Sequence, residues 1–136
     1  NTDDFIMYAW AEVEGFSKFG SYTGNANVDG PFIYTGFKPA FILEKRVDSA
    51  GAWYITDMTR DTYNPVNKYL MPDVANAEAS GSTSSGVYLD ALSNGYKIRG
   101  AGAGQEYNRS GGTYIFAAFA EHPFQGADGV TQARAR

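Results

Sequence analysis

Short runs of alternating apolar and polar residues constrain the fold of this chain more than any other feature. In residues 5–13, Phe5, Met7 and Ala9 point to one side of an extended chain, while Tyr8 and Trp10 point to the other. No segment of ten or more residues shows the 3.6-residue period of an amphipathic helix. Strands spaced by roughly 8–12 residues, with Gly, Asn and Ser between them, are typical of β-sandwiches and barrels. We therefore predict an all-β fold, an antiparallel and jelly-roll-like β-sandwich with about eight to nine strands.

The same reasoning places the other elements along the chain. Strands are predicted over residues 16–22, 32–35, 40–47, 53–58, 87–92, 96–99 and 113–121, with a short one at 69–71 and one helical turn within 74–79. Residues 48–51 form a hairpin connection between two of these strands. Asn94 and Gly95 predict a second hairpin, because both residues tolerate a positive φ angle.

Composition excludes several classes of protein. The chain has 136 residues, which favours one domain, and a formal net charge of −4. The absence of Cys excludes a disulfide framework, a thiol nucleophile and a Cys-ligated zinc site. The acidic balance argues against a general nucleic-acid binder, which needs surplus Lys and Arg. No apolar run approaches the roughly 20 residues of a membrane span.

The two ends of the chain resemble each other. Residues 5–12 (FIMYAWAE) align with residues 114–121 (YIFAAFAE), and four of the eight positions are identical. The pairs Phe5/Tyr114 and Trp10/Phe119 are aromatic in both segments. We therefore interpret residues 1–14 as a strand resembling the last strand of a preceding repeat unit, 15–124 as the β-sandwich domain and 125–136 as a polar tail. Such a strand would pair at the edge of this domain's sheet or with a neighbouring subunit.

Several segments carry a family resemblance. Residues 16–25 (FSKFGSYTGN), 36–46 (GFKPAFILEKR), 53–57 (WYITD) and 112–121 (GTYIFAAFAE) resemble a repeated β-domain of tailed-phage structural proteins. The resemblance covers about residues 5–124 and implies a tail, tail-fibre or other virion protein without catalytic residues. The resembled units are often in tandem, whereas one full unit is present here.

Catalytic arrangements are weakly supported by the residues. His122 is the single histidine and precedes Pro123 at a strand end, and no Gly-x-Ser-x-Gly elbow is present. The carboxylate pairs Glu12/Glu14 and Glu44/Asp57 could serve a glycoside-hydrolase dyad. Such pairs are more often found on the solvated face of a sheet, so we predict no catalytic residues.

Metal and phosphate sites are weighed in the same way. Asn25, Asn27 and Asp29 form one cluster of oxygen ligands, and Asp57, Asp61 and Asn64 form another. The alternative is turn chemistry, in which these side chains bond to nearby backbone. The Gly-rich segment 100–104 lacks the Lys and the helix of a phosphate-binding loop. We predict no metal and no cofactor.

Aromatic residues are the candidate binding groups. The chain has 21 of them, more than a core of this size needs, and exposed Tyr and Trp suit both protein interfaces and sugar stacking. The candidate glycan or interface aromatics are Trp53, Tyr63, Tyr69, Tyr88 and Tyr107. The candidate interface residues of the two terminal strands, which we expect to be edge strands, are Phe5, Met7, Tyr8, Trp10, Tyr114, Phe116 and Phe119.

Three functional hypotheses follow. The first is a non-enzymatic structural protein of a tailed-phage virion, assembling as a fibre, tail or decoration component through β-edge and aromatic interfaces. Its partners would be other copies and other virion proteins, with no nucleic acid and no membrane insertion, and it would reside in the extracellular particle. The second is a carbohydrate-binding adhesin domain at a fibre tip that recognises a host surface glycan. The third and weakest is a hydrolase.

Overall fold

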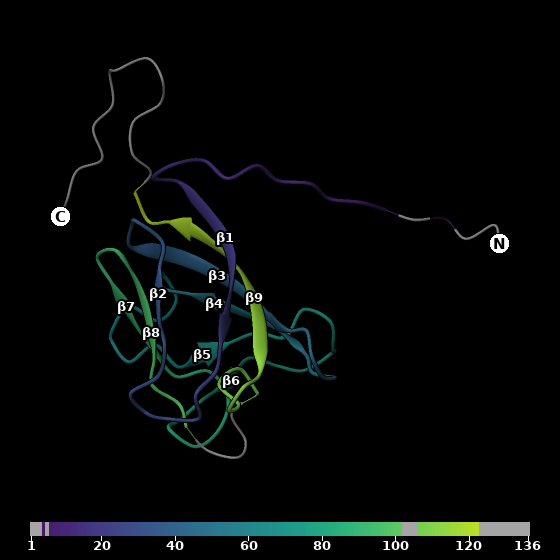
Figure 1. Ribbon diagram of the computed structural model, residues 1–136, viewed down its shortest axis with the longest axis vertical. Coiled ribbons are helices and arrows are strands. Elements are labelled where there is room, and N and C mark those ends of the chain that lie inside the picture. Colours follow the sequence, from purple (N-terminus) through teal and green to yellow (C-terminus); the bar gives the residue numbers. More distant parts are fainter. Residues whose placement is uncertain (1–3, 5, 102–105, 123–136) are drawn as a thin grey trace.

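The structure is an antiparallel all-β assembly (Figure 1), given by a computed structural model that describes residue 4 and residues 6–101 and 106–122. Nine strands and no helix occur in these ranges, which confirms the predicted fold class. The strands are β1 (Ser17–Thr23), β2 (Phe32–Tyr34), β3 (Pro39–Arg46), β4 (Trp53–Asp57), β5 (Lys68–Tyr69), β6 (Ala79–Ser80), β7 (Leu89–Leu92), β8 (Gly95–Ile98) and β9 (Thr113–Ala120).

The strands form two main sheets. One has the order β1-β9-β3-β4, the second has the order β2-β8-β7, and β5 and β6 form a separate small ribbon. The antiparallel pairs β1/β9 and β2/β8 lie in different sheets, and the chain crosses from one main sheet to the other between β1 and β2, β2 and β3, β4 and β7, and β8 and β9. This winding of paired strands is jelly-roll-like.

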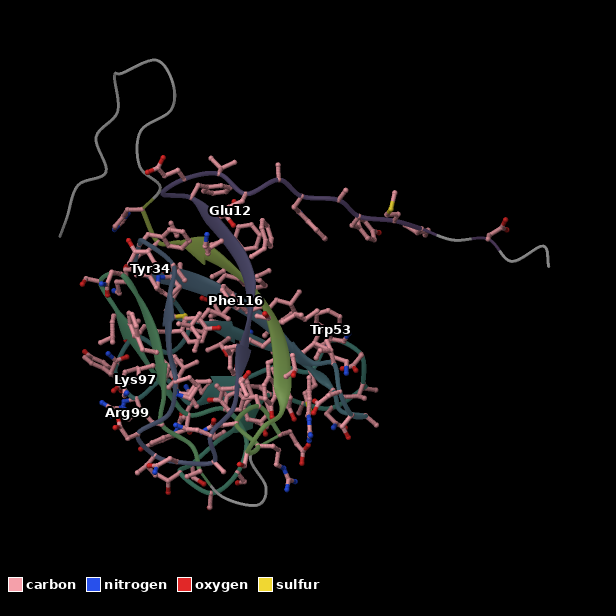
Figure 2. The ribbon with its side chains drawn as sticks, viewed as in Figure 1. Glu12, Tyr34, Trp53, Lys97, Arg99 and Phe116 are labelled. Carbon is pink, nitrogen blue, oxygen red and sulfur yellow. The ribbon has the colours of Figure 1, made fainter. Side chains whose placement is uncertain are left out.

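Alternate residues of the two sheets fill the space between them. Tyr114, Phe116 and Ala118 of β9 are buried, whereas their neighbours along the strand are less so. The Tyr22 and Tyr114 rings stack with centroids 4.9 Å apart, and Tyr96 of the second sheet meets the Phe116 ring edge-on at 6.0 Å. Figure 2 places Phe116 in the middle of this body. Burial of such side chains stabilises the fold by about 1.5–3 kcal/mol each.

Three predicted elements differ from the structure. β9 lies between β1 and β3, so the prediction that residues 113–121 form an edge strand is wrong. Residues 74–78 form no helical turn, since their run is too short to nucleate a helix. The predicted strand at 5–13 is absent from its described part, residues 6–12, and Phe5 lies outside the described residues.

The predicted hairpin at Asn94 is confirmed, but its turn is not the expected one. Leu92 pairs with Gly95, so the two turn residues are Ser93 and Asn94. Neither Asn94 nor Gly95 has a positive φ angle. Gly95 is required for a different reason: a Cβ atom there would lie 2.2 Å from the carbonyl oxygen of Ile33 on the neighbouring strand.

In the ranges described above, the structure contains no helix of the length and apolar character that crossing a bilayer requires.

Candidate functional site

Residues 6–13, which we call the arm, extend away from the sandwich (Figures 1 and 2). Ile6, Met7, Tyr8 and Trp10 are 82%, 87%, 73% and 67% exposed. The Tyr8 and Trp10 rings stack on each other at 6.1 Å. The arm has the alternation of a strand but no partner strand beside residues 6–12, which explains why no strand forms.

The base of the arm is fixed to the start of β1. The Ser17 amide donates to the Val13 carbonyl at 2.9 Å, and the Val13 amide donates to the buried Ser17 hydroxyl at 3.0 Å. Lys18 donates to Glu12 Oε1 at 2.6 Å, and this bond lowers the pKa of Glu12. The point where the arm leaves the body is therefore defined, while its apolar side chains remain in solvent.

The outer face of the β1-β9-β3-β4 sheet carries many apolar side chains, with Ser21, Lys45 and Asp57 in the same outward rows. Strand register places Phe19, Ala117, Leu43 and Ile55 in one row across the four strands. The neighbouring row contains Phe119 and Phe41, and the Phe119 ring lies 5.9 Å from each of Phe16, Phe19 and Phe41. We define the outer face as Phe19, Phe41, Leu43, Ile55, Ile115, Ala117 and Phe119.

This outer face is unusual for a sandwich. Strands of a sandwich normally alternate inward apolar and outward polar residues. β9 reads TYIFAAFA, and its outward Ile115 is 39% exposed, so it is apolar on both faces. Continuous apolar character is typical of strands buried on both sides. This face, like the arm, therefore presents large apolar side chains on the outside of the sandwich.

The sequence-predicted aromatics do not gather at one place. Tyr63 is 83% exposed in a loop, Trp53 is half-buried on the outward side of β4, and Tyr69 packs edge-on against Tyr54 with centroids 5.4 Å apart. Tyr88 is half-buried and lines a groove described below. The structure therefore offers no single stacking platform built from these residues.

Three predicted binding aromatics are core residues, so their assignment to an interface is wrong. Tyr107 is 1% exposed; its hydroxyl accepts a hydrogen bond from the Tyr88 amide, and its carbonyl accepts one from the Tyr22 hydroxyl at 2.9 Å. Tyr114 and Phe116 face inward on β9 and are buried. Alternation gives two faces, and the sequence alone did not show that the face of Tyr114 and Phe116 is the inward one. Phe119 stays on the outer face.

The predicted carboxylate dyad is not formed. Glu44 is 1% exposed and faces the core, where the Tyr96 hydroxyl donates to its Oε1 at 2.8 Å. Asp57 belongs to the outward row of Phe41, so the two carboxylates lie on opposite sides of the sheet. Burial raises the pKa of Glu44 to about 7, partly offset by the hydrogen bond from Tyr96. This group is a buried core carboxyl.

The other candidate catalytic and ligand residues lie on the surface or bond to nearby groups. Glu12 pairs with Lys18, Glu14 is exposed beside it, and His122 is exposed at the end of the described chain. In the predicted ligand clusters, Asn25 Oδ1 accepts from the Asn27 amide at 3.0 Å, and Asn27 Oδ1 accepts from the Asp29 amide at 2.9 Å. These bonds are the turn chemistry that was the alternative to metal binding.

The second predicted cluster shows the same chemistry. Asp57 Oδ1 accepts from the Thr59 amide at 2.8 Å, and Asp61 Oδ2 accepts from the Asn67 amide at 2.7 Å. The Asn64 side chain pairs with both backbone groups of Ala91. Among the described residues, no group of three or more His, Asp or Glu side chains converges on a common point.

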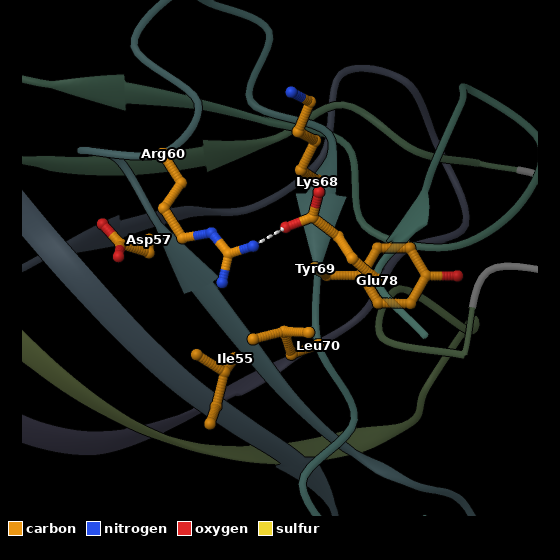
Figure 3. A pocket seen from close by; sticks show the side chains of 7 residues that line it. All are labelled: Ile55, Asp57, Arg60, Lys68, Tyr69, Leu70 and Glu78. Carbon is orange, nitrogen blue, oxygen red and sulfur yellow. Dashed lines mark hydrogen bonds and ion pairs between the residues drawn. The ribbon is translucent and has the colours of Figure 1, made fainter. Parts of the chain in front are cut away.

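The concave sites differ in size. The pocket beside β4 and β5 holds the Arg60–Glu78 ion pair over Ile55 and Leu70 (Figure 3). Its volume of about 10 Å³ admits no more than a water molecule. A larger groove of about 550 Å³ is lined by Tyr88, Asp90 and Arg99, with Arg99 Nε bonded to Asp90 at 2.6 Å. An open groove of about 350 Å³ separates the base of the arm from Tyr34 of β2.

The outer face was missed by reasoning from the sequence. Its signal is present in residues 114–120, which are apolar without interruption and therefore indicate a strand buried on both faces.

Comparison with known proteins gives one match. Searches among curated proteins and among solved structures found none. A family model described as a domain of unknown function, DUF7483, matches residues 1–123, which include the arm. The chain therefore belongs to the DUF7483 family.

Proposed function

We propose that this chain is a non-enzymatic structural subunit of a tailed-phage virion that assembles with other copies of itself. The observation that carries the proposal is the arm, whose large apolar side chains are 67–87% exposed at four positions. The apolar outer face supplies a second surface of the same character. Covering a large apolar side chain is favourable by about 1.5–3 kcal/mol, so both surfaces favour association.

The structure changes which residues serve this proposal. Met7, Tyr8 and Trp10 of the arm and Phe119 of the outer face are accessible for contact, whereas Tyr114 and Phe116 belong to the core. The interface then consists of the arm and the outer face. An interface of the obligate type buries on the order of 2,000 Å² or more.

Placement in a virion rests on the motif resemblance in residues 16–25, 36–46, 53–57 and 112–121. A fibre, tail or decoration component fits a protein whose surfaces are built for repeated contact. Membership of the DUF7483 family is compatible with this role and assigns no activity.

The experiment is measurement of molar mass by light scattering after size-exclusion chromatography, across concentrations from about 1 to 100 µM. We expect the chain to be oligomeric and the double variant Tyr8→Ser/Trp10→Ser to be monomeric. Tyr63→Ser is the matched control, because Tyr63 is equally exposed but lies in a loop away from the arm. A chain that is monomeric at every concentration would overturn the proposal.

A second candidate is the carbohydrate-binding adhesin, favoured by the groove at Tyr88, Asp90 and Arg99. An aromatic ring beside hydrogen-bonding charged groups suits a sugar, which stacks its apolar face and pairs its hydroxyls. A glycan array compares the chain with Tyr88→Ala, and with Trp53→Ala and Tyr63→Ala for two predicted aromatics outside the groove. Glycan binding that Tyr88→Ala abolishes would support this candidate, and absence of binding to any host polysaccharide would exclude it.

A further inference from the structure

We propose that the arm of one copy pairs with the free edge of β1 in a second copy, adding an antiparallel strand to its four-stranded sheet. This inference rests on the proposed self-association and specifies the surface that accepts the arm. It makes the contact one of backbone hydrogen bonds between strands, to which the apolar side chains of the arm add burial.

β1 has an edge that is unoccupied beyond Ser17, whose amide is bonded to the Val13 carbonyl of the same chain. The Phe16 carbonyl accepts from the Ala120 amide at 2.8 Å, so every second residue from Phe16 directs its backbone toward β9. Phe19 and Ser21 are out of step with Phe16 and direct their backbone groups away from β9. The Phe19 amide meets Glu12 Oε2 at 3.5 Å, the limit of a hydrogen bond. An incoming strand can therefore replace that contact.

The other sheet edges are less available. On β4, Ile55 exchanges two backbone hydrogen bonds with Leu70 at 2.8 and 3.0 Å. On β7, Leu89 exchanges two with Val66 at 2.7 and 3.0 Å. β2 has three residues, against seven in β1. Among the described strands, β1 thus offers the longest open edge.

The arm has the side-chain order of a strand that pairs with β1. β9, which β1 already binds in antiparallel orientation, repeats the arm sequence at an offset of 109 residues. In the β9 register Ile115 is opposite Ser21 and Ala117 is opposite Phe19. The same register on the free edge places Ile6 opposite Ser21 and Tyr8 opposite Phe19. Ile6 and Tyr8 then extend the apolar outer face by one strand.

The distribution of charge also favours the body of a second copy, and not a second arm, as the surface that binds the arm. Asp3, Asp4, Glu12 and Glu14 are the charged residues of positions 1–14, a formal charge of −4. The remaining chain has eleven acidic and eleven basic residues, which cancel. Two copies of segment 1–14 in contact would repel each other, whereas this segment on β1 meets a body of no net charge.

Disulfide trapping between separately purified variants tests the pairing, because the chain has no Cys of its own. Ile6→Cys is mixed with Ser21→Cys under mild oxidation, and the mixed product is identified by mass spectrometry. Directly opposite residues of antiparallel strands have Cα atoms about 4.5–5.5 Å apart, within the range of a disulfide. The control partner is Ser49→Cys, equally exposed but located in the β3–β4 connection.

We expect the Ile6→Cys and Ser21→Cys pair to give at least a tenfold excess of mixed disulfide over the control pair. Equal yields with Ser49→Cys, or a higher yield with Tyr34→Cys on β2, would overturn the assignment of the β1 edge. The proposed function would survive that result if Tyr8→Ser/Trp10→Ser still dissociates the oligomer. Circular dichroism of each variant verifies that the sandwich is intact before mixing.

Discussion

At the scale of single residues, Glu44 is the clearest departure from ordinary sandwich chemistry. Its carboxyl is buried between the sheets, and its Oε2 has no hydrogen-bond partner among the described residues. The Tyr96 hydroxyl donates to Oε1 at 2.8 Å. A charge here is poorly compensated, which is why burial raises the pKa of Glu44 to about 7.

The pH dependence of stability follows from this pKa. Between pH 4.5 and about 7 the folded state holds a proton on Glu44 that the unfolded state releases, so the free energy of unfolding falls as pH rises. The difference corresponds to roughly 3 kcal/mol. We expect Glu44→Gln to remove this slope and to be more stable than the parent chain at pH 8. Urea unfolding at pH 5, 6, 7 and 8 measures the free energy of unfolding of both proteins.

The control for this experiment is Glu121→Gln. Its ion pair with Lys38 lowers the pKa of Glu121, so its contribution is lost at acidic pH, below the window of Glu44. Glu121→Gln should therefore keep the slope of the parent chain between pH 5 and 7. Parallel stability curves for the parent chain and Glu44→Gln would contradict the assignment of the slope to this buried carboxyl.

At the scale of elements, the outer face makes a prediction that concerns β9. Ile115 is on the outward side of β9 and is 39% exposed, so a charge there can remain solvated in the monomer. Covered by a partner, the same charge would lose its water. We expect Ile115→Glu to weaken self-association by at least tenfold in dissociation constant, with little change in the melting temperature of the monomer. Sedimentation velocity measures the association.

Ser80→Glu serves as the matched control for Ile115→Glu. Ser80 is exposed on β6, outside the outer face, so the same added charge should leave association unchanged. An Ile115→Glu variant that associates as strongly as Ser80→Glu would show that the outer face is not covered in the oligomer.

Elements with their own local signals could be predicted from the sequence. The strands at β1, β3, β4, β7, β8 and β9 fall where alternation placed them, and the hairpin between β7 and β8 was recognised from Asn94 and Gly95. The central position of β9 could not be predicted, because strand order depends on contacts between residues distant in sequence. The exposed arm was predicted as a strand because its residues alternate as those of a strand do. A strand also needs a neighbouring strand for its backbone hydrogen bonds, and alternation does not show whether one is present.

The candidate site could be predicted only in part, because a sequence pattern does not show which side chains the folded chain buries. The arm residues Met7, Tyr8 and Trp10, predicted as interface residues, are exposed, and their contact with a partner stays a prediction, whereas Tyr107 and Tyr114 are buried. Tyrosine occurs both in cores and on surfaces, since its ring is apolar and its hydroxyl is polar. The buried Tyr107 hydroxyl accepts a hydrogen bond from the Tyr88 amide, and a sequence pattern does not reveal this contact.

At the scale of the whole molecule, the distribution of charge decides between two ways of associating. The acidic residues of positions 1–14 account for the entire net charge of −4, and the rest of the chain is balanced. If arms packed against arms, added salt would screen their repulsion and strengthen association. If an arm packs on the body of a second copy, the long-range repulsion is absent and salt has little effect.

We therefore expect the dissociation constant to change by less than about threefold between 0.1 M and 1 M NaCl, although the screening length shortens from about 10 Å to about 3 Å over that range. Light scattering at a fixed series of protein concentrations measures the dissociation constant at each salt concentration. The variant Asp4→Asn/Glu14→Gln, which halves the charge of positions 1–14, should associate like the parent chain at 0.1 M NaCl. A steep gain of association with salt, reproduced at low salt by this variant, would instead place two arms in contact, because removal of repulsion would then be the common cause of both effects.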